Sequence, residues 1–363
     1  MYFLIAVSIH KYSEFVLFLW ENHPTPGMKQ SLLLLTLAAL LTGGLASPVS
    51  AQERWGVVNL SAAFLRSAPD YESALETQAL MGSVVEILGE QGYWRQVVQH
   101  DPEYTAWMTE LGVVELSRSE MEAYLAAPKY ICTAPLTQIY DKSSGKRVRI
   151  GELVQGDLVR QALDASGYPV RALGFNKVVL PDGREGFVRS LHLKRFTEWA
   201  RDSFVSVAGI GKTARQFLGV PYLWGGASPK NLDCSGLVWM TYFLNGVILP
   251  RNASQQAKCG AEVQLNKLRE GDLIFFGTPA TADKPERVAH VGISLGGNLF
   301  IHASHVVRIN SLDPEAENYY DSKTPLFARR IFDHRGGLFV DDKGNREVLG
   351  PGVIAVRDSQ YYF

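Results

Sequence analysis

The alternation of apolar and polar residues divides the chain into stretches with different textures. From Gln52 to about Ala126, short runs rich in Val, Ile, Thr and aromatic residues alternate with Gly-, Pro- and Asp-containing turns, and the same texture returns from Lys129 to about Phe196. Such runs predict strands, and many short strands at this spacing favour small barrels. Both stretches share one order of runs, which indicates an internal repeat. We therefore predict two small β-barrel domains, residues 52–127 and 128–196.

The pattern changes after residue 197. Apolar residues recur every three or four positions from Glu198 to Leu218, which predicts a helix. A second helix is predicted from Cys234 to about Asn245, ended by Gly246. The runs GDLIFF, HVGISLGG, LFIHAS and VVRINSL then predict short strands. A helix followed by antiparallel strands is an α+β arrangement, expected over residues 197–335, with a C-terminal tail, 336–363, in which no element is predicted.

The N-terminal region has the pattern of an export signal. Met28 and Lys29 precede the apolar run SLLLLTLAALLTGGLA and a small-residue site ending at Ala51, which predicts a cleavable signal peptide over residues 28–51. We expect a periplasmic or secreted protein with no stable membrane anchor after cleavage. We interpret residues 1–27 as a mis-annotated extension; a signal anchor built from both apolar patches is the alternative.

Composition narrows the possible functions. The formal net charge of −1 does not favour nucleic acid, whose binding depends on clustered Lys and Arg. The three cysteines, Cys132, Cys234 and Cys259, are too few for a disulfide scaffold and cannot all pair within one chain. The sequence has no HExxH, Cys-x-x-Cys or Walker-type motif, so we predict neither a metal site nor a cofactor.

Cys234 lies where a Gly-rich loop meets the second predicted helix. A helix N-terminus favours a thiolate, and Asp233 suits the helix cap. His290 and His302 occupy two predicted strands joined at Gly296-Gly297, so pairing would bring both imidazoles to one face. These residues can form a nucleophile, a base and an orienting group. A histidine in an apolar strand also fits an ordinary core position, while Cys132 and Cys259 lack such a context and are interpreted as structural.

The motifs YLWGG, DCSGL, PRNASQQA, GDLIFF, AHVGI and FIHAS occur in this order between about residues 200 and 330. Together they resemble the NlpC family of papain-like cell-wall cysteine peptidases. The resemblance implies that Cys234 attacks the peptide, that His290 is the base and that His302 orients His290.

The two preceding β domains resemble bacterial SH3-like modules. The layout is similar to that of γ-D-glutamyl-L-diamino acid endopeptidases, which cut between D-Glu and the diamino acid of the stem peptide L-Ala-γ-D-Glu-diaminopimelate. Enzymes of that type tend to require a free L-Ala amine. The resemblance therefore implies peptidoglycan stem peptides as the partner, and turnover fragments as the preferred substrate.

Further site residues are expected near the nucleophile. Tyr222 could donate to the developing oxyanion beside the Cys234 backbone N–H, or simply pack. Trp224 could wall the pocket. Asp233 and Ser235 could bind polar groups of the substrate. Arg251 could be a solvated charge.

Asn252 is a departure from the pattern, because amine-selective members usually carry an acid after Pro-Arg. An amide pairs less strongly than a carboxylate with an ammonium group. Glu76, or Glu72 beside it, could supply the charge from the first β domain, or both could be solvated surface acids. Trp107 could form part of a lid over the cleft, with packing inside the barrel as the alternative.

Two other functions remain open at this level. The chain could be a catalytically inert peptidoglycan-binding protein. It could also be an amidase or acyltransferase of the same fold.

Overall fold

The structure is a computed structural model, and it describes residues 53–202, 207–331 and 352–362. The predictions for residues 1–51 lie outside this range. No helix in the described part of the chain is long and apolar enough to cross a membrane.

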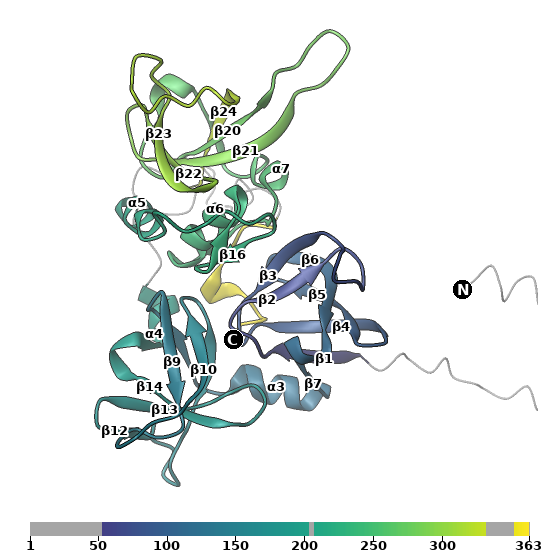
Figure 1. Ribbon diagram of the computed structural model, residues 1–363, viewed down its shortest axis with the longest axis vertical. Helices are drawn as coiled ribbons and strands as arrows, with labels where there is room; N and C mark the ends of the chain where they lie inside the picture. Colours follow the sequence, from purple (N-terminus) through teal and green to yellow (C-terminus); the bar gives the residue numbers. More distant parts are fainter. Residues whose placement is uncertain (1–52, 203–206, 332–351, 363) are drawn as a thin grey trace, which may run out of the picture. The chain divides into compact units, whose positions relative to one another are not determined.

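The first β domain is an antiparallel sheet of seven strands (Figure 1). Buried and more exposed positions alternate along its strands, as in β6, where Ala106 and Met108 are buried and Thr105 and Trp107 are not, because successive side chains point to opposite faces. The order across the sheet is β3-β2-β6-β5-β4-β1-β7. The bounds are β1 (Arg54–Val58), β2 (Ala63–Arg66), β3 (Leu75–Ala79), β4 (Val84–Gln91), β5 (Trp94–His100), β6 (Glu103–Thr109) and β7 (Val113–Leu116).

The second β domain repeats this topology. Its sheet has the order β10-β9-β14-β13-β11-β8-β15, with the short β12 paired to β13. Strand for strand, in chain order, this matches the first sheet, so the predicted internal repeat is confirmed. The bounds are β8 (Lys129–Cys132), β9 (Leu136–Tyr140), β10 (Arg149–Val154), β11 (Leu158–Gln161), β12 (Arg171–Ala172), β13 (Phe175–Val179), β14 (Glu185–Arg189) and β15 (Leu193–Arg195).

The predicted closure into barrels is wrong, because neither sheet closes among the described residues. Three of the four end strands, β3, β7 and β15, contact elements outside their sheets instead. On β3, the Gln78 side chain accepts a hydrogen bond from the backbone N–H of Ala227 (2.8 Å). Helix α3 (Arg118–Ala126), capped by Ser117, follows β7, and α4 (Phe196–Asp202) follows β15 directly. Covered edges do not need barrel closure to avoid exposed strand backbone.

The helix predicted over 198–218 is divided. The described residues form α4 (Phe196–Asp202) and α5 (Val207–Arg215), followed by turns up to Gly219. Phe204, one of the residues that set the predicted spacing, lies outside the described part. The predicted second helix is confirmed as α6 (Cys234–Phe243), and Gly246 has the positive φ (83°) expected after a helix end.

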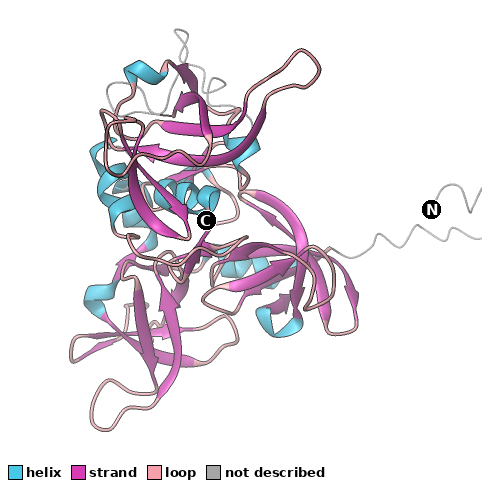
Figure 2. Cartoon of the chain, turned by 45° about the horizontal axis from the view of Figure 1, so that its top comes forward, coloured by secondary structure: helices cyan, strands magenta, loops and turns pink. Residues whose placement is uncertain are grey.

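The C-terminal α+β domain packs helices against a six-stranded antiparallel sheet of order β19-β24-β20-β21-β22-β23. Figure 2 shows that its helices gather next to this sheet, whereas the two β domains consist mainly of strands. The bounds are β16 (Ala227–Ser228), β17 (Asn231–Leu232), β18 (Val247–Ile248), α7 (Ala253–Gln256), β19 (Ala261–Val263), β20 (Leu273–Thr278), β21 (Arg287–Ser294), β22 (Leu299–Ser304), β23 (Val306–Ser311) and β24 (Thr324–Arg330). The four strands predicted from sequence are β20 to β23.

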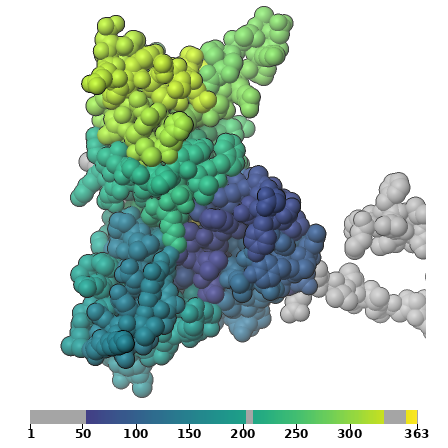
Figure 3. All heavy atoms as spheres, viewed as in Figure 1, coloured from purple at the N-terminus to yellow at the C-terminus, as the bar shows by residue number. Residues whose placement is uncertain are grey.

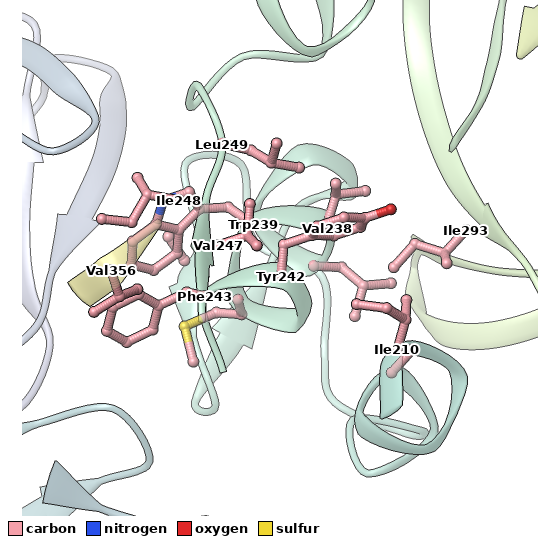
Figure 4. Packing of buried hydrophobic residues seen from close by; sticks show 14 of the residues in the cluster. Ile210, Val238, Trp239, Tyr242, Phe243, Val247, Ile248, Leu249, Ile293 and Val356 are labelled. Atoms are coloured by element: carbon pink, nitrogen blue, oxygen red, sulfur yellow. The ribbon is translucent and has the colours of Figure 1, made fainter. Parts of the chain in front are cut away.

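Helix α6 is the centre of the main core. After Cys234, every residue to Phe243 is buried, so the helix is enclosed on all sides rather than amphipathic. Figure 4 shows Val238, Trp239 and Tyr242 among apolar side chains from α5, β18 and β21. This packing fixes the helix, and with it the position of Cys234.

Residues 352–362 connect the three domains. Strand β25 (Ile354–Ala355) pairs with β18 of the α+β domain. The Ser359 hydroxyl donates to Asp101 of the first β domain, and the Tyr361 ring stacks on His100 with centroids 4.1 Å apart. Tyr362 packs against Phe196 at the start of α4. The part of the predicted tail that is described is therefore an ordered strap.

The hairpin between β20 and β21 projects from the α+β domain. Residues 278–287 are exposed, and Figure 3 shows the tip of the hairpin standing out from the surface.

Candidate active site

Cys234 is the first residue of α6 and is partly exposed. The side chain of Asp233 accepts a hydrogen bond from the backbone N–H of Gly236 (2.6 Å), which confirms the predicted cap. A Cβ atom on Gly236 would lie 2.0 Å from the carbonyl oxygen of Gly226. Only glycine therefore allows the loop to approach the helix so closely, and the DCSG segment is constrained by packing as well as by chemistry.

The surroundings of Cys234 favour the protonated thiol over the thiolate. Burial, followed by the negative charge of Asp233, raises its pKa to about 11. Hydrogen bonding from the Val291 backbone N–H, the positive charge of Arg251 and the Ser235 backbone N–H act in the opposite direction but do not prevail. Because the thiolate is the nucleophilic form, this cysteine needs a base that removes its proton.

A pair of histidines lies on β21 and β22, two strands of the sheet that contact α6. His290 on β21 directly precedes Val291, whose backbone N–H reaches Cys234. His290 Nε2 is 2.7 Å from His302 Nδ1, with both rings buried. The turn between their strands places Gly296 and Gly297 at φ values of 89° and 58°, where glycine is favoured. The sequence-predicted pairing of these imidazoles is present.

Both imidazoles are neutral at pH 7. Burial, then the charges of His302 and Lys323, lowers the pKa of His290 to about 3. Burial also lowers the pKa of His302 to about 4, with Arg308 acting in the same direction and a hydrogen bond to Asn310 opposing it. A neutral imidazole has a free lone pair and can act as a base.

Asn310 and Tyr320 also belong to this part of the site, and the sequence analysis missed both. Asn310 Oδ1 lies 2.9 Å from His302 Nε2. The Tyr320 ring stacks near His290 (centroids 5.8 Å apart, 30°) and meets His302 edge-on at 4.8 Å. Asn310 lies in the predicted strand VVRINSL, two positions after Arg308. Polar residues at every second position of a strand lie on one face, and this pattern could have pointed to Asn310. Tyr320 lies outside any periodic run, and no pattern pointed to it.

The interpretation of Arg251 as a solvated charge is wrong. Its side chain is 3% exposed and pairs with Asp233 (Nη2 to Oδ2, 2.6 Å). Nη1 donates to the Ser235 hydroxyl (2.9 Å), and Nε donates to Thr77 on β3 of the first β domain (2.8 Å). Asp233 also accepts from the Gly225 backbone N–H (2.9 Å). Asp233 and Ser235, expected to bind substrate, are thus engaged by partners within the chain.

Glu76 is not a solvated acid, since it is half-buried on β3 and accepts a hydrogen bond from the Tyr104 hydroxyl (2.6 Å). Burial and the Glu76 carboxylate raise the pKa of Tyr104 to about 12, while hydrogen bonding with Asn252 and the charge of Arg251 oppose the rise. Tyr104 therefore brings Glu76 and Asn252, from two domains, to one corner next to Arg251. Glu72, in contrast, is exposed.

The three aromatic candidates differ in their surroundings. Tyr222 is half-buried, and its pKa is raised by burial and by the charges of Cys234 and Asp233, which places its phenol beside the nucleophile. Trp224 is 66% exposed in the loop before α6 and is not a packing residue. Trp107 is half-buried on β6, across from Arg66 on β2. Within the described residues, no hydrogen bond or ring contact joins Trp107 or Trp224 to the cysteine and the histidines.

The remaining cysteines are buried. Burial raises the pKa of Cys132 to about 12 and that of Cys259 to about 11, which suits structural positions. No group of His, Cys, Asp and Glu side chains suited to hold a metal ion is found in the described ranges.

Comparison with known families matches residues 219–329 to the NlpC/P60 family and residues 65–111 to the bacterial dipeptidyl-peptidase Sh3 domain. Over 133 residues the chain is 38% identical to the probable endopeptidase NlpC of Escherichia coli, covering 36% of this chain and 81% of that protein. The chain belongs to the NlpC/P60 family.

Two longer similarities extend over the β domains. This NlpC/P60 protein is 28% identical over 268 residues to a γ-D-glutamyl-L-lysine dipeptidyl-peptidase of Bacillus subtilis, covering 72% of this chain and 82% of the relative. The crystal structure of an NlpC/P60 family protein from Bacillus cereus superimposes with a TM-score of 0.62 at 25% identity, covering 76% of this chain and 99% of that one. The predicted family, the papain-like α+β fold with an SH3-like β domain before it, and the assignment as a hydrolase with peptidase activity are confirmed.

Proposed function

We propose that this NlpC/P60 protein is a cell-wall cysteine endopeptidase that hydrolyses the γ-D-Glu–diamino acid bond of peptidoglycan stem peptides. The observation that carries the proposal is the neutral, hydrogen-bonded pair His290–His302, together with the backbone N–H of Val291, the residue after His290, which hydrogen-bonds to Cys234. A protonated thiol beside a neutral imidazole is the starting arrangement for nucleophilic catalysis that needs no metal or cofactor.

The reaction follows from these groups. His290 Nε2 is occupied by His302, so Nδ1 is the atom that takes the Cys234 proton. The thiolate then attacks the γ-carbonyl carbon of D-Glu, and the Cys234 backbone N–H and the Tyr222 phenol donate to the oxyanion. The imidazolium of His290 protonates the leaving amine of the diamino acid. Water, deprotonated by His290, finally hydrolyses the thioester and releases the free γ-carboxylate of D-Glu.

The corner formed by Glu76, Tyr104 and Asn252 supports a preference for fragments with a free L-Ala amine. Asn252 alone offers no charge, but the half-buried Glu76 carboxylate lies one hydrogen bond away through Tyr104. A carboxylate with reduced solvent access pairs more strongly with an ammonium group than an exposed one does. Glu76 is therefore the proposed counter-charge, and Trp107 and Trp224 are proposed walls of the cleft.

The charges beside the histidines support meso-diaminopimelate as the diamino acid. Arg308 is the cross-strand neighbour of His302, and the Lys323 charge acts on His290. Neither cation forms an ion pair with another described residue. Meso-diaminopimelate carries a side-chain carboxylate that L-lysine lacks, so two such cations favour it. The Bacillus subtilis relative, in contrast, is named for L-lysine.

A set of three tripeptides tests the proposal by mass analysis of the products. These are L-Ala-γ-D-Glu-meso-diaminopimelate, the same peptide ending in L-lysine, and the first peptide with an acetylated L-Ala amine. We expect the rate of cleavage after D-Glu to decrease from the first peptide to the third. The Cys234→Ala variant should cleave none of them and should unfold at the same temperature as the native protein. Binding without cleavage by the native protein would support the inert alternative, and products cut at another bond would support an amidase or acyltransferase.

We also propose that the protein is exported and that residues 28–51 are then cleaved off as a signal peptide. The support is the signal-like pattern that ends at Ala51. N-terminal sequencing of the protein recovered from the periplasm or the medium should begin near Gln52, and recovery with the full N-terminus in a membrane fraction would instead support the signal anchor.

A further inference from the structure

The hydrogen bonds behind His302 have a fixed direction. The carbonyl oxygen of Asn318 can only accept, and it receives a hydrogen bond from the Asn310 amide nitrogen, Nδ2 (2.7 Å). The Ser311 backbone N–H donates to the same carbonyl (2.9 Å), which holds it in place. The Asn310 side chain is therefore oriented by main-chain groups, with Oδ1 turned toward His302 (2.9 Å).

This orientation determines where the ring protons lie. Because Asn310 Oδ1 only accepts, the proton of the neutral His302 ring must be on Nε2. Its Nδ1 then carries a lone pair and must accept from His290 Nε2 (2.7 Å). The single proton of the neutral His290 ring is consequently on Nε2, and its Nδ1 is unprotonated. Turning the Asn310 amide over would place its oxygen against the Asn318 carbonyl oxygen, which is unfavourable.

We propose that Asn310 is a positioning residue that fixes the Nε2–H tautomer of both His302 and His290, so that the His290 Nδ1 lone pair is free to take the Cys234 proton. The inference rests on the proposed function for its catalytic consequence. The chain of partners runs from the Asn318 carbonyl through Asn310 and His302 to His290, across strands β23, β22 and β21. A backbone carbonyl thus sets the protonation pattern of the base.

The test compares two substitutions and a control. Asn310→Leu removes the acceptor while keeping a similar volume, so a buried N–H is left without a partner. Asn310→Asp keeps an acceptor for His302 but loses the donor to the Asn318 carbonyl, so it tests whether an acceptor alone fixes the tautomer. Asn318→Ala keeps the backbone carbonyl and removes only the side chain, and serves as the matched control.

Nitrogen-15 NMR of the imidazole rings is the decisive readout, because it reports tautomers independently of peptide cleavage. We expect the Nε2–H form for both rings in the native protein, in Asn310→Asp and in Asn318→Ala, and a mixture of tautomers in Asn310→Leu. With the meso-diaminopimelate tripeptide, Asn310→Leu should lower kcat by about tenfold or more at nearly unchanged KM, a fraction of what general base catalysis contributes, while Asn310→Asp retains most of it.

Three results would overturn the inference: an Nδ1–H tautomer for either histidine in the native protein, unchanged tautomers in Asn310→Leu, or an Asn318→Ala variant that behaves like Asn310→Leu. If Asn310→Leu does not fold, the native tautomers and the Asn310→Asp variant still decide. The native protein could show the expected tautomers and still cleave none of the three peptides. That result would refute the proposed function, but it would leave the role of Asn310 in fixing the tautomers intact.

Discussion

Two buried polar networks meet at Cys234, and they are built from different chemistry. The histidine network consists of His290, His302 and Asn310, all neutral and all within strands β21 to β23. The arginine network joins Asp233 and Arg251 as an ion pair and reaches Thr77 in another domain. One is local and uncharged, and the other is charged and spans two domains.

The difference indicates that the two networks have different roles. Imidazole nitrogens can switch between donor and acceptor, so the histidine network can move a proton. A guanidinium group stays protonated throughout the physiological range, so the arginine network cannot act as a base. It holds the helix cap and the first β domain against the loop that carries Tyr222. We therefore expect variants of the first network to lose activity and variants of the second to lose stability.

The largest effect should come from His290→Gln. The proposed base is removed while a polar side chain remains, so we expect kcat/KM for the meso-diaminopimelate tripeptide to fall by about 10²–10⁴-fold. Steady-state assays combined with urea unfolding provide the measurement. A variant that keeps activity to within a factor of a few, or that loses mainly stability, would erase the distinction between the networks.

Arg251→Met should have the largest effect on stability. It leaves the Asp233 carboxylate buried without its partner, which typically costs about 3–5 kcal/mol of the free energy of unfolding. Arg118→Met is the control, because Arg118 pairs with Glu53 and Glu122 at 65% side-chain exposure, and such surface pairs contribute about 0–1 kcal/mol. Equal losses in the two variants would contradict the structural role of the arginine network.

A smaller loss is expected for Thr77→Val, which removes the acceptor of the Arg251 Nε–H and leaves that donor buried. We expect a decrease of about 1–3 kcal/mol in the free energy of unfolding, measured by urea denaturation. Thr105→Val on the exposed face of β6 changes the same residue type in a strand without breaking this contact. If both threonine variants are equally stable, the link between the domains does not contribute.

Near neutral pH, the smallest of the expected effects is the change in the free energy of unfolding with pH that the histidine network causes. Both histidines have a folded-state pKa, about 3 and about 4, below the value near 6.5 of an unfolded chain. Their contribution to stability is therefore complete above about pH 6.5 and is lost as the pH falls toward 4 and then 3, with a slope of up to about 1.4 kcal/mol per pH unit for each proton. Urea unfolding between pH 7 and 4 should show a shallower slope in His302→Gln than in the native protein. Identical slopes would show that His302 is not buried in its neutral form.

The sequence predicted the histidine network better than the arginine network, for a physical reason. His290 and His302 lie on adjacent strands joined by a short turn, and strand alternation alone brings them to one face. Arg251 finds Asp233 and Thr77 only through the packing of separate elements, which no local pattern encodes. Its position in the polar stretch PRNASQQA suggested a solvated surface, whereas the fold buries it.

The fold shows the same contrast. Short strands, the α6 cap and the internal repeat were predictable because each depends on neighbouring residues. Closure of the sheets was not, because whether β3 needs a strand partner depends on its contact with the distant strand β16, where the Gln78 side chain accepts from the Ala227 backbone N–H. Tyr320 was likewise invisible, since it comes from a loop and meets the histidines only in the folded protein.

The strap of residues 352–362 has a consequence for the order in which the molecule assembles. Ser359 and Asp101 are 258 positions apart in the chain, and contacts over such separations form late because a long loop must be closed first. The hairpins within each sheet join residues that are close in sequence, so they can form before these long-range contacts. We therefore expect the contacts between the domains to be the last part of the structure to form, and the first to be lost when a protease cuts the strap.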